Sequence, residues 1–170
     1  MCRAKFSLPR IAKIALSDTT NILLMRIYLD TSALAKAYLT EVASDTVRSI
    51  ISQSSHTYIS SLNITEMRCM LARRVRSGHF AADVETRLWA AFQTDVTNEV
   101  FDLFAVQPAL YIEAAALIDR INPTPLRTLD ALHLCIAEHL EPDRFITTDR
   151  QLAKAALTIG LNVDQLEHSA

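Results

Sequence analysis

The chain has 170 residues, of which 50% are hydrophobic and 21% are charged, and its formal net charge is −2. This composition is typical of one soluble globular domain, and a chain of this length buries roughly 70% of its surface without disulfides or a structural metal. Charged residues interrupt every apolar stretch before it reaches about 18 residues, which excludes a membrane-spanning helix.

The first segment differs in charge from the rest of the chain. Residues 1–25 contain four basic residues against one acidic residue, a net charge of +3 that leaves −5 for the remainder. We expect residues 1–24 to form a basic, loosely ordered extension before a single domain over residues 25–170. A basic arm for nucleic acid, a transit peptide and a misplaced start codon near Met25 are the alternatives.

The first half of the body alternates between strand and helix patterns. A β-prone run over residues 26–30 ends in Asp30, and a helical pattern opens directly after it. The pattern then predicts a helix over residues 44–51, a strand over residues 56–60, and a helix that begins at Asn63 and continues toward Gly78.

The second half continues the same alternation. It predicts a helix over residues 81–99, a strand over residues 101–106 and a helix from Pro108 to about residue 121. A loop with two prolines follows at residues 122–125. The remaining predicted elements are a helix capped by Thr128 that reaches residue 140, a strand over residues 144–148, a helix opened by Asp149, and a short strand over residues 161–163.

This order of elements predicts the fold class. Strands that alternate with helices, without hairpin turns, favour a mainly parallel central sheet in a three-layer α/β/α fold. Ligands of such sheets bind beyond the carboxyl ends of the strands. Asp30 and Asp149 each follow a predicted strand, so both are expected at that edge.

Several common functional motifs are absent from the chain. Its only glycines, Gly78 and Gly160, are too far apart to form a phosphate-binding loop. The three cysteines include no CxxC pair and the five histidines no HExxH motif, which excludes the common zinc sites. Unpaired cysteines are typical of a reducing compartment, so we expect a cytoplasmic protein.

Two further acids complete a candidate metal site. Glu66 is expected in the first turn of the helix after the second strand, and Asp130 in the first turn after Thr128. Four carboxylates at one rim repel one another unless cations neutralise them, and ligand sets made only of oxygen favour Mg²⁺ or Mn²⁺. Such ions activate water for phosphodiester cleavage. The acids therefore predict metal-assisted hydrolysis of nucleic acid.

Each acid also has a purely structural interpretation. Asn63 and Glu66 match a helix N-cap and its carboxylate partner. Asp130, in the first turn of its helix, would interact favourably with the positive end of the helix dipole. Asp30 and Asp149 match simple helix caps. Because a helix that starts at the rim also directs its first side chains toward it, caps and ligands are compatible roles. His133, on the same face of its helix as Asp130, is interpreted as orienting a carboxylate, contacting substrate or packing in the core.

Four motifs carry a resemblance to a known family. They are IYLDTSALAKAY at residues 27–38 followed by Glu41, SSLNITE at residues 60–66, LDALHL at residues 129–134, and FITTD at residues 145–149. In this order and spacing they resemble the acidic motifs of PIN-domain ribonucleases, specifically VapC-type toxins of toxin-antitoxin pairs. The likeness extends from Met25 to Val163, and the basic segment before Met25 departs from it.

The resemblance implies a site and an activity. It implies that the four acids ligate Mg²⁺ or Mn²⁺ and that nearby hydroxyl groups hold these acids without binding the metal ion themselves. It also implies that the protein is an endoribonuclease toxin, which is silenced by an antitoxin from the same operon. A homodimer is the implied assembly. The acids are Asp30, Glu66, Asp130 and Asp149; the supporting residues are Thr31, Ser32, Thr147 and His133.

Because the net charge is slightly negative, affinity for RNA requires a local basic patch. The helix after the second strand carries most of the candidates, with a solvated basic face as the alternative. Trp89 is expected to pack a helix pair, or to contact an antitoxin or a second copy of the chain, rather than to stack on bases. The candidate residues for substrate or partner binding are Arg68, Arg73, Arg74 and Lys36, with Arg76 and Arg150 nearby.

Two other functions are weighed against the nuclease. A phosphatase or receiver with a nucleophilic aspartate also places an acid at a strand end, but position 32 is Ser where the phosphatase needs a second Asp, and a receiver's adjacent acid pair is absent. A non-catalytic PIN-fold module that binds RNA or protein is the second alternative. Convergence of the four acids at one place favours the nuclease over that module.

Overall fold

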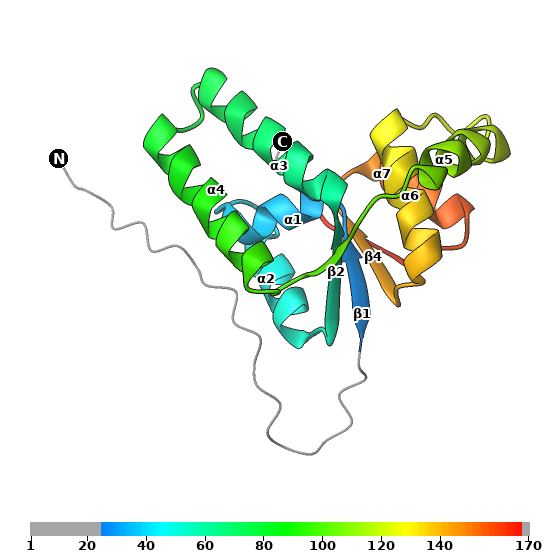
Figure 1. The fold of residues 1–170 in the computed structure, drawn as a ribbon, viewed down its shortest axis with the longest axis horizontal. Helices are drawn as coiled ribbons and strands as arrows, with labels where there is room; N and C mark the ends of the chain where they lie inside the picture. Colours follow the sequence, from blue (N-terminus) through cyan, green and yellow to red (C-terminus); the bar gives the residue numbers. More distant parts are fainter. Residues whose placement is uncertain (1–24, 168–170) are drawn as a thin grey trace, which may run out of the picture.

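The computed structural model describes residues 25–167, and the predicted properties of residues 1–24 lie outside this range. The centre of the fold is one parallel sheet of five strands in the order β3-β2-β1-β4-β5 (Figure 1). The strands are β1 (Arg26–Leu29), β2 (His56–Ser60), β3 (Asp102–Phe104), β4 (Arg144–Thr147) and β5 (Val163–Gln165). Strand β1 is therefore the middle of the sheet.

Helices cover both faces of this sheet (Figure 1). One face carries α1 (Thr31–Tyr38), α2 (Ser44–Gln53), α3 (Ser61–Arg76) and α4 (Ala82–Thr97), and the other carries α5 (Ala109–Arg120), α6 (Thr128–Leu140) and α7 (Arg150–Thr158). The predicted three-layer α/β/α fold is confirmed. Among the described residues, no helix is long and apolar enough to cross a membrane.

The alternation of side chains along β1 divides the core in two. Ile27 and Leu29 point to the cluster under α1–α4, whereas Tyr28 points to the cluster under α5–α7. All three side chains are fully buried. Parallel strands covered on both faces are expected to be apolar throughout, and the hydroxyl of Tyr28 is a polar atom within such a strand.

Some predicted boundaries are wrong by a few residues. The third strand is shorter than expected, and the last strand begins at Val163 rather than ending there. Helix α6 is preceded by Arg127 as its N-cap, so Thr128 is its first residue and not its cap. Helix α3 begins at Ser61, because Ser60 and Asn63 form a capping box at its start.

The sheet order creates a switch point beside β1. The chain first builds the sheet outward from β1 through β2 to β3, then crosses to the other side to place β4 and β5. Crevices at such switch points, outside the carboxyl ends of the strands, are the usual ligand sites of α/β folds. Asp30 follows β1 and Asp149 follows β4 closely, so the two acids flank the switch point.

Candidate functional site

A cleft of about 460 Å³ opens at this end of the sheet. All four predicted acids line it, together with four arginines. The acids come from the starts of α1, α6 and α7 and from α3. The arginines are Arg73, Arg74, Arg76 and Arg127.

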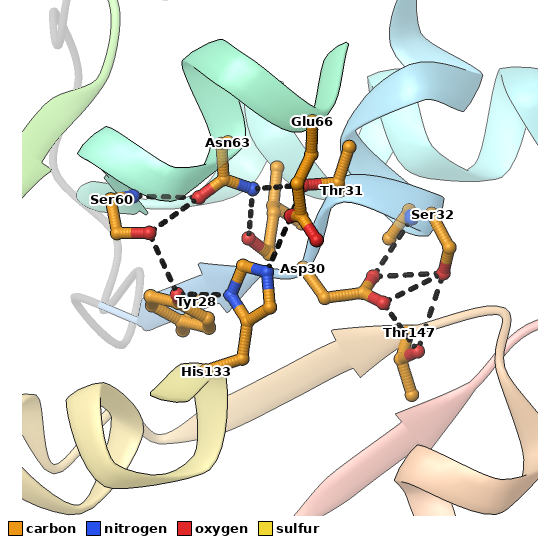
Figure 2. Close-up of polar contacts among 11 residues, drawn as sticks. Tyr28, Asp30, Thr31, Ser32, Ser60, Asn63, Glu66, His133 and Thr147 are labelled. Carbon is orange, nitrogen blue, oxygen red and sulfur yellow. Dashed lines mark hydrogen bonds and ion pairs between the residues drawn. The ribbon is translucent and has the colours of Figure 1, made fainter. Parts of the chain in front are cut away.

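Asp30 is the most deeply buried acid, with 4% of its surface exposed. Its carboxylate caps α1 by accepting the N–H of Ala33 at 2.9 Å, and it accepts the hydroxyls of Ser32 at 2.8 Å and of Thr147 at 2.9 Å (Figure 2). Burial raises the pKa of Asp30 above its usual range, although the nearby His133 and these hydrogen bonds oppose the shift. Hydrogen bonds thus hold the carboxylate in place, and within residues 25–167 no Lys or Arg forms an ion pair with it.

Glu66 lies in the second turn of α3, not in the first turn as predicted, because the capping box moves the helix start to Ser61. Its Oε2 accepts two hydrogen bonds, from the hydroxyl of Thr31 and from Nε2 of His133 at 2.8 Å (Figure 2). Burial alone would raise the pKa of Glu66. The hydrogen bonds from His133 and Thr31 outweigh burial and hold this pKa below its usual range.

Asp130 and Asp149 line the cleft from the starts of α6 and α7. Asp149 caps α7 by accepting the N–H groups of Gln151 at 2.7 Å and Leu152 at 3.1 Å. Asp130 lies in the first turn of α6, as predicted. Burial and the negative charge of Asp149 raise the pKa of Asp130 above its usual range. These two acids therefore share a region of negative potential.

The structural interpretations of the acids have different outcomes. Asp30 and Asp149 are helix caps, and both also line the cleft. The capping pair of Asn63 with Glu66 is wrong, since Asn63 pairs with Ser60. His133 contacts a carboxylate as one interpretation predicted, but its partner is Glu66 from α3 rather than Asp130 from its own helix.

The basic candidates separate into two groups. Arg73 and Arg74 line the cleft, whereas Arg68 lies outside its lining, pairs with Glu85 and stacks 5.6 Å from the ring of Trp89. Lys36 lines the cleft but is only 2% exposed. Trp89 packs against the core under α1–α4, as expected.

Glu41 forms ion pairs with two basic residues of the cleft, Lys36 and Arg74. Its Oε2 accepts Nζ of Lys36 at 2.7 Å, and its Oε1 accepts a guanidinium N–H of Arg74. Burial would raise the pKa of Glu41, but these two cations outweigh it and lower this pKa. Lys36 is therefore committed to an ion pair and is not a free phosphate ligand.

The donor set is chemically suited to a hard divalent cation. The acids and hydroxyls offer oxygen atoms; the free thiol of Cys69 and the ring of His133 also line the cleft, and the ring is already hydrogen-bonded to Glu66. Within residues 25–167, no three His, Cys, Asp or Glu side chains are arranged as a ready-made metal cage. Mg²⁺ normally keeps several waters and takes one or two carboxylates, so an open acidic cleft matches its requirements better than a closed cage would.

Three residues at the site were missed by reasoning from the sequence. Asn63 donates to Thr31 at 3.1 Å, Tyr28 lies 2.6 Å from Nδ1 of His133, and Arg127 lines the cleft. The available signal for Tyr28 was a hydroxyl in an otherwise apolar strand. Asn63 lay within the second motif, where its amide was read as a cap for a helix beginning at that position.

Comparisons with known proteins identify the family. The model of the PIN domain family matches residues 27–157. Ribonuclease VapC46 of Mycobacterium tuberculosis is 33% identical over 141 residues, which cover 81% of this chain and 95% of the relative. Ribonuclease VapC47 of the same species is 27% identical over 140 residues, which cover 79% of this chain and 92% of the relative.

A solved structure agrees on the fold. The crystal structure of PAE2754 from Pyrobaculum aerophilum matches with a TM-score of 0.61 and 18% identity over 84% of this chain and 85% of that one. At this identity the likeness concerns the architecture alone. The family model and the curated relatives carry the assignment: the chain belongs to the PIN-domain family and, within it, to the VapC-type ribonucleases.

Proposed function

We propose that this PIN-domain ribonuclease is a toxin that hydrolyses RNA phosphodiester bonds in the cleft at the switch point. The observation that carries the proposal is the joint lining of one cleft by the four predicted carboxylates and four arginines. A site of this kind combines a place for hard cations with a surface for phosphates. The carboxylates proposed as metal ligands are Asp30, Glu66, Asp130 and Asp149.

The proposed cofactor is Mg²⁺ or Mn²⁺. A divalent ion bound by these carboxylates supplies an activated water and stabilises the leaving oxygen of the in-line displacement. The side chains around the acids orient them for this role: Ser32 and Thr147 hold Asp30, whereas Thr31 and His133 hold Glu66. The raised pKa values of Asp30 and Asp130 support the proposal, because they show that the charged carboxylates are destabilised at this site and that a bound cation would stabilise them.

RNA is proposed to lie across the arginine side of the cleft. Arg73, Arg76 and Arg127 are the proposed phosphate contacts, and Arg74 is partly committed to Glu41. Since the whole chain has a net charge of −2, this local patch has to supply the electrostatic attraction. Arg68, paired with Glu85 outside the cleft, supports helix packing in this proposal rather than RNA binding.

The proposed partners are the RNA substrate, a cognate antitoxin protein and a second copy of the chain, in the cytoplasm. The support is membership in the VapC-type ribonucleases. Exposed apolar side chains on α5 support a protein partner: Tyr111 is 56% exposed and Ile112 is 76% exposed. A non-catalytic binding module is the alternative function that the following experiment separates.

The test is cleavage of a total-RNA pool by protein freed of any partner, with Mg²⁺ or Mn²⁺ and with EDTA. Asp30→Asn, prepared in the same way, controls for contaminating nuclease. We expect discrete fragments that require both the metal ion and Asp30. Equal cleavage by the two proteins, or binding of RNA without any cleavage, would reject the nuclease and favour the binding module.

A further inference from the structure

Behind Glu66, six side chains form a ring of polar contacts (Figure 2). They come from β1, α1, the end of β2, α3 and α6. Four of the six are at most 2% exposed, so water does not complete their hydrogen bonds. In order around the ring, they are Tyr28, His133, Glu66, Thr31, Asn63 and Ser60.

Two backbone groups fix the orientation of the Asn63 amide. Its Nδ2 lies 3.2 Å from the carbonyl oxygen of Leu29, which only accepts. Its Oδ1 lies 2.7 Å from the backbone N–H of Ser60, which only donates. The amide is therefore not free to exchange its two ends.

The direction of three more hydrogen bonds follows from this orientation. Because Oδ1 of Asn63 is an acceptor, the hydroxyl of Ser60 donates to it at 2.9 Å. Nδ2 of Asn63 donates to the hydroxyl oxygen of Thr31 at 3.1 Å. Thr31 in turn donates its proton to the carboxylate of Glu66.

Tyr28 then has one proton and two neighbouring acceptors. Its hydroxyl lies 2.6 Å from Nδ1 of His133 and 3.3 Å from Oγ of Ser60. Ser60 has already given its proton to Asn63, and burial raises the pKa of Tyr28 so that its phenol stays protonated. Because the contact with His133 is much the shorter of the two, we infer that the phenol donates to Nδ1 of His133 rather than to Ser60.

The proton on His133 is thereby assigned. With Nδ1 accepting from Tyr28, the hydrogen that the ring donates to Glu66 lies on Nε2. That nitrogen lies 2.8 Å from Oε2 of Glu66, which as a carboxylate only accepts. Two series of hydrogen bonds thus meet at Oε2 of Glu66. One runs from Tyr28 through His133, and the other runs from Asn63 through Thr31.

We propose that Tyr28 is a positioning residue of the ribonuclease site, whose hydroxyl holds the His133 ring with its proton on Nε2. Glu66 is then held through Oε2 by His133 and Thr31, while Oε1 remains available for a divalent cation. The inference rests on the proposed function, because Tyr28 affects metal binding only if Glu66 is a metal ligand. Outer hydrogen-bond partners of this kind typically contribute 10- to 100-fold to metal affinity.

The first test is ¹⁵N NMR of the histidine ring in the metal-free protein. We expect a proton on Nε2 of His133 and an unprotonated, hydrogen-bonded Nδ1. In Tyr28→Phe, which keeps the stacking of the ring on Phe145, the Nδ1 resonance should move toward the value of a free imidazole nitrogen. A proton on Nδ1, or an Nδ1 resonance that does not move, would overturn the proposal.

The second test is a double-mutant cycle read out as the Kd of Mn²⁺. Tyr28→Phe should weaken Mn²⁺ binding about tenfold. His133→Gln keeps an N–H donor at the Nε2 position but has no atom at Nδ1, so in that background Tyr28→Phe should have no further effect. An equal loss in both backgrounds would show that Tyr28 acts through packing and would overturn the proposal.

Tyr38→Phe is the matched control. Tyr38 is also buried, and its hydroxyl donates to Asp95 at 2.7 Å on the other side of the sheet. This variant should lower the thermal midpoint and leave the Kd of Mn²⁺ unchanged. If the unsubstituted chain binds no Mn²⁺, the proposed function fails and the inference with it; if it binds Mn²⁺ and Tyr28→Phe binds equally well, only the inference fails.

Discussion

Nε2 of His133 lies 2.8 Å from Oε2 of Glu66, and this contact joins two motifs that are 67 positions apart in the chain. Glu66 belongs to α3 on one face of the sheet, and His133 belongs to α6 on the other. The contact therefore links the two helical layers to each other beyond the end of β1. It also gives the third motif a second role, because Asp130 lines the cleft while His133 hydrogen-bonds to Glu66.

Asp30→Asn should separate metal binding from stability. Asn caps helices about as well as Asp, and the substitution removes a charge whose burial raises the pKa of Asp30. We expect a thermal midpoint in EDTA equal to or above that of the unsubstituted chain. Mn²⁺ at about 100 times its Kd should stabilise the unsubstituted chain by about 2.7 kcal/mol and the variant far less. An equal Mn²⁺-induced shift in both proteins would argue against Asp30 as a ligand.

The arginines of the cleft should control RNA affinity through charge. In an Asp30→Asn background, which binds RNA without cutting it, Arg73→Gln and Arg127→Gln should each reduce the salt slope of RNA binding by about 0.7. Arg87→Gln, on the exposed face of α4, is the control and should leave the slope unchanged. Arg68→Gln should also leave it unchanged, because Arg68 pairs with Glu85. If Arg68→Gln reduced the salt slope of RNA binding as much as Arg73→Gln does, the proposed path of the RNA would be contradicted.

Glu41→Gln should destabilise the fold at neutral pH, because it leaves the buried Lys36 without its carboxylate. The expected loss in free energy of unfolding is about 1–3 kcal/mol. The pKa of Glu41 is lower in the folded chain than its ordinary value of 4.5. The contribution of the Glu41 carboxylate to the free energy of unfolding is therefore complete above pH 4.5. It is lost as the pH falls through the pKa of Glu41 in the folded chain.

Urea unfolding of the two proteins across this pH range checks the prediction. The stability difference between the unsubstituted chain and Glu41→Gln should shrink as the pH falls below 4.5. Asp83→Asn, which removes an exposed pair with Arg87, should cost at most about 0.5 kcal/mol at any pH. A difference that grows toward acid pH would contradict the assigned sign.

Asn63→Ala should destabilise the fold by about 1–3 kcal/mol, since it leaves the buried N–H of Ser60 and the carbonyl of Leu29 without their partner. It also removes the donor behind Thr31, so the Kd of Mn²⁺ should increase. Chemical denaturation and Mn²⁺ titration measure the two effects. Thr65→Ala, at an exposed position of the same helix, is the control and should change stability by less than about 0.5 kcal/mol.

The architecture was predictable because periodicity and strand-end acids are local signals. The alternation of strands and helices predicted the parallel sheet, and Asp30 at the end of β1 marked the edge where the cleft lies. Residue order alone did not predict which strand crosses to which side. That crossing, between β3 and β4, is what brings Asp149 next to Asp30.

The errors arise where side chains compete for one backbone group. Asn63 was read as the cap of its helix, but Ser60 occupies that position and Asn63 returns its amide to Ser60, which shifts Glu66 to the second turn. The partners of Tyr28 and His133 could not be predicted either. They meet across the sheet, 105 positions apart, and no spacing rule connects a strand residue to a helix that follows so far along the chain.

The most direct test of the account is the position of the ion itself. A crystal grown with Mn²⁺ should show an anomalous-scattering peak in the cleft, in contact with Asp30 and at least one of the other three acids. In Asp30→Asn crystals the peak should weaken or disappear. A peak only outside the cleft, or the same peak in both proteins, would contradict a metal site built on Asp30.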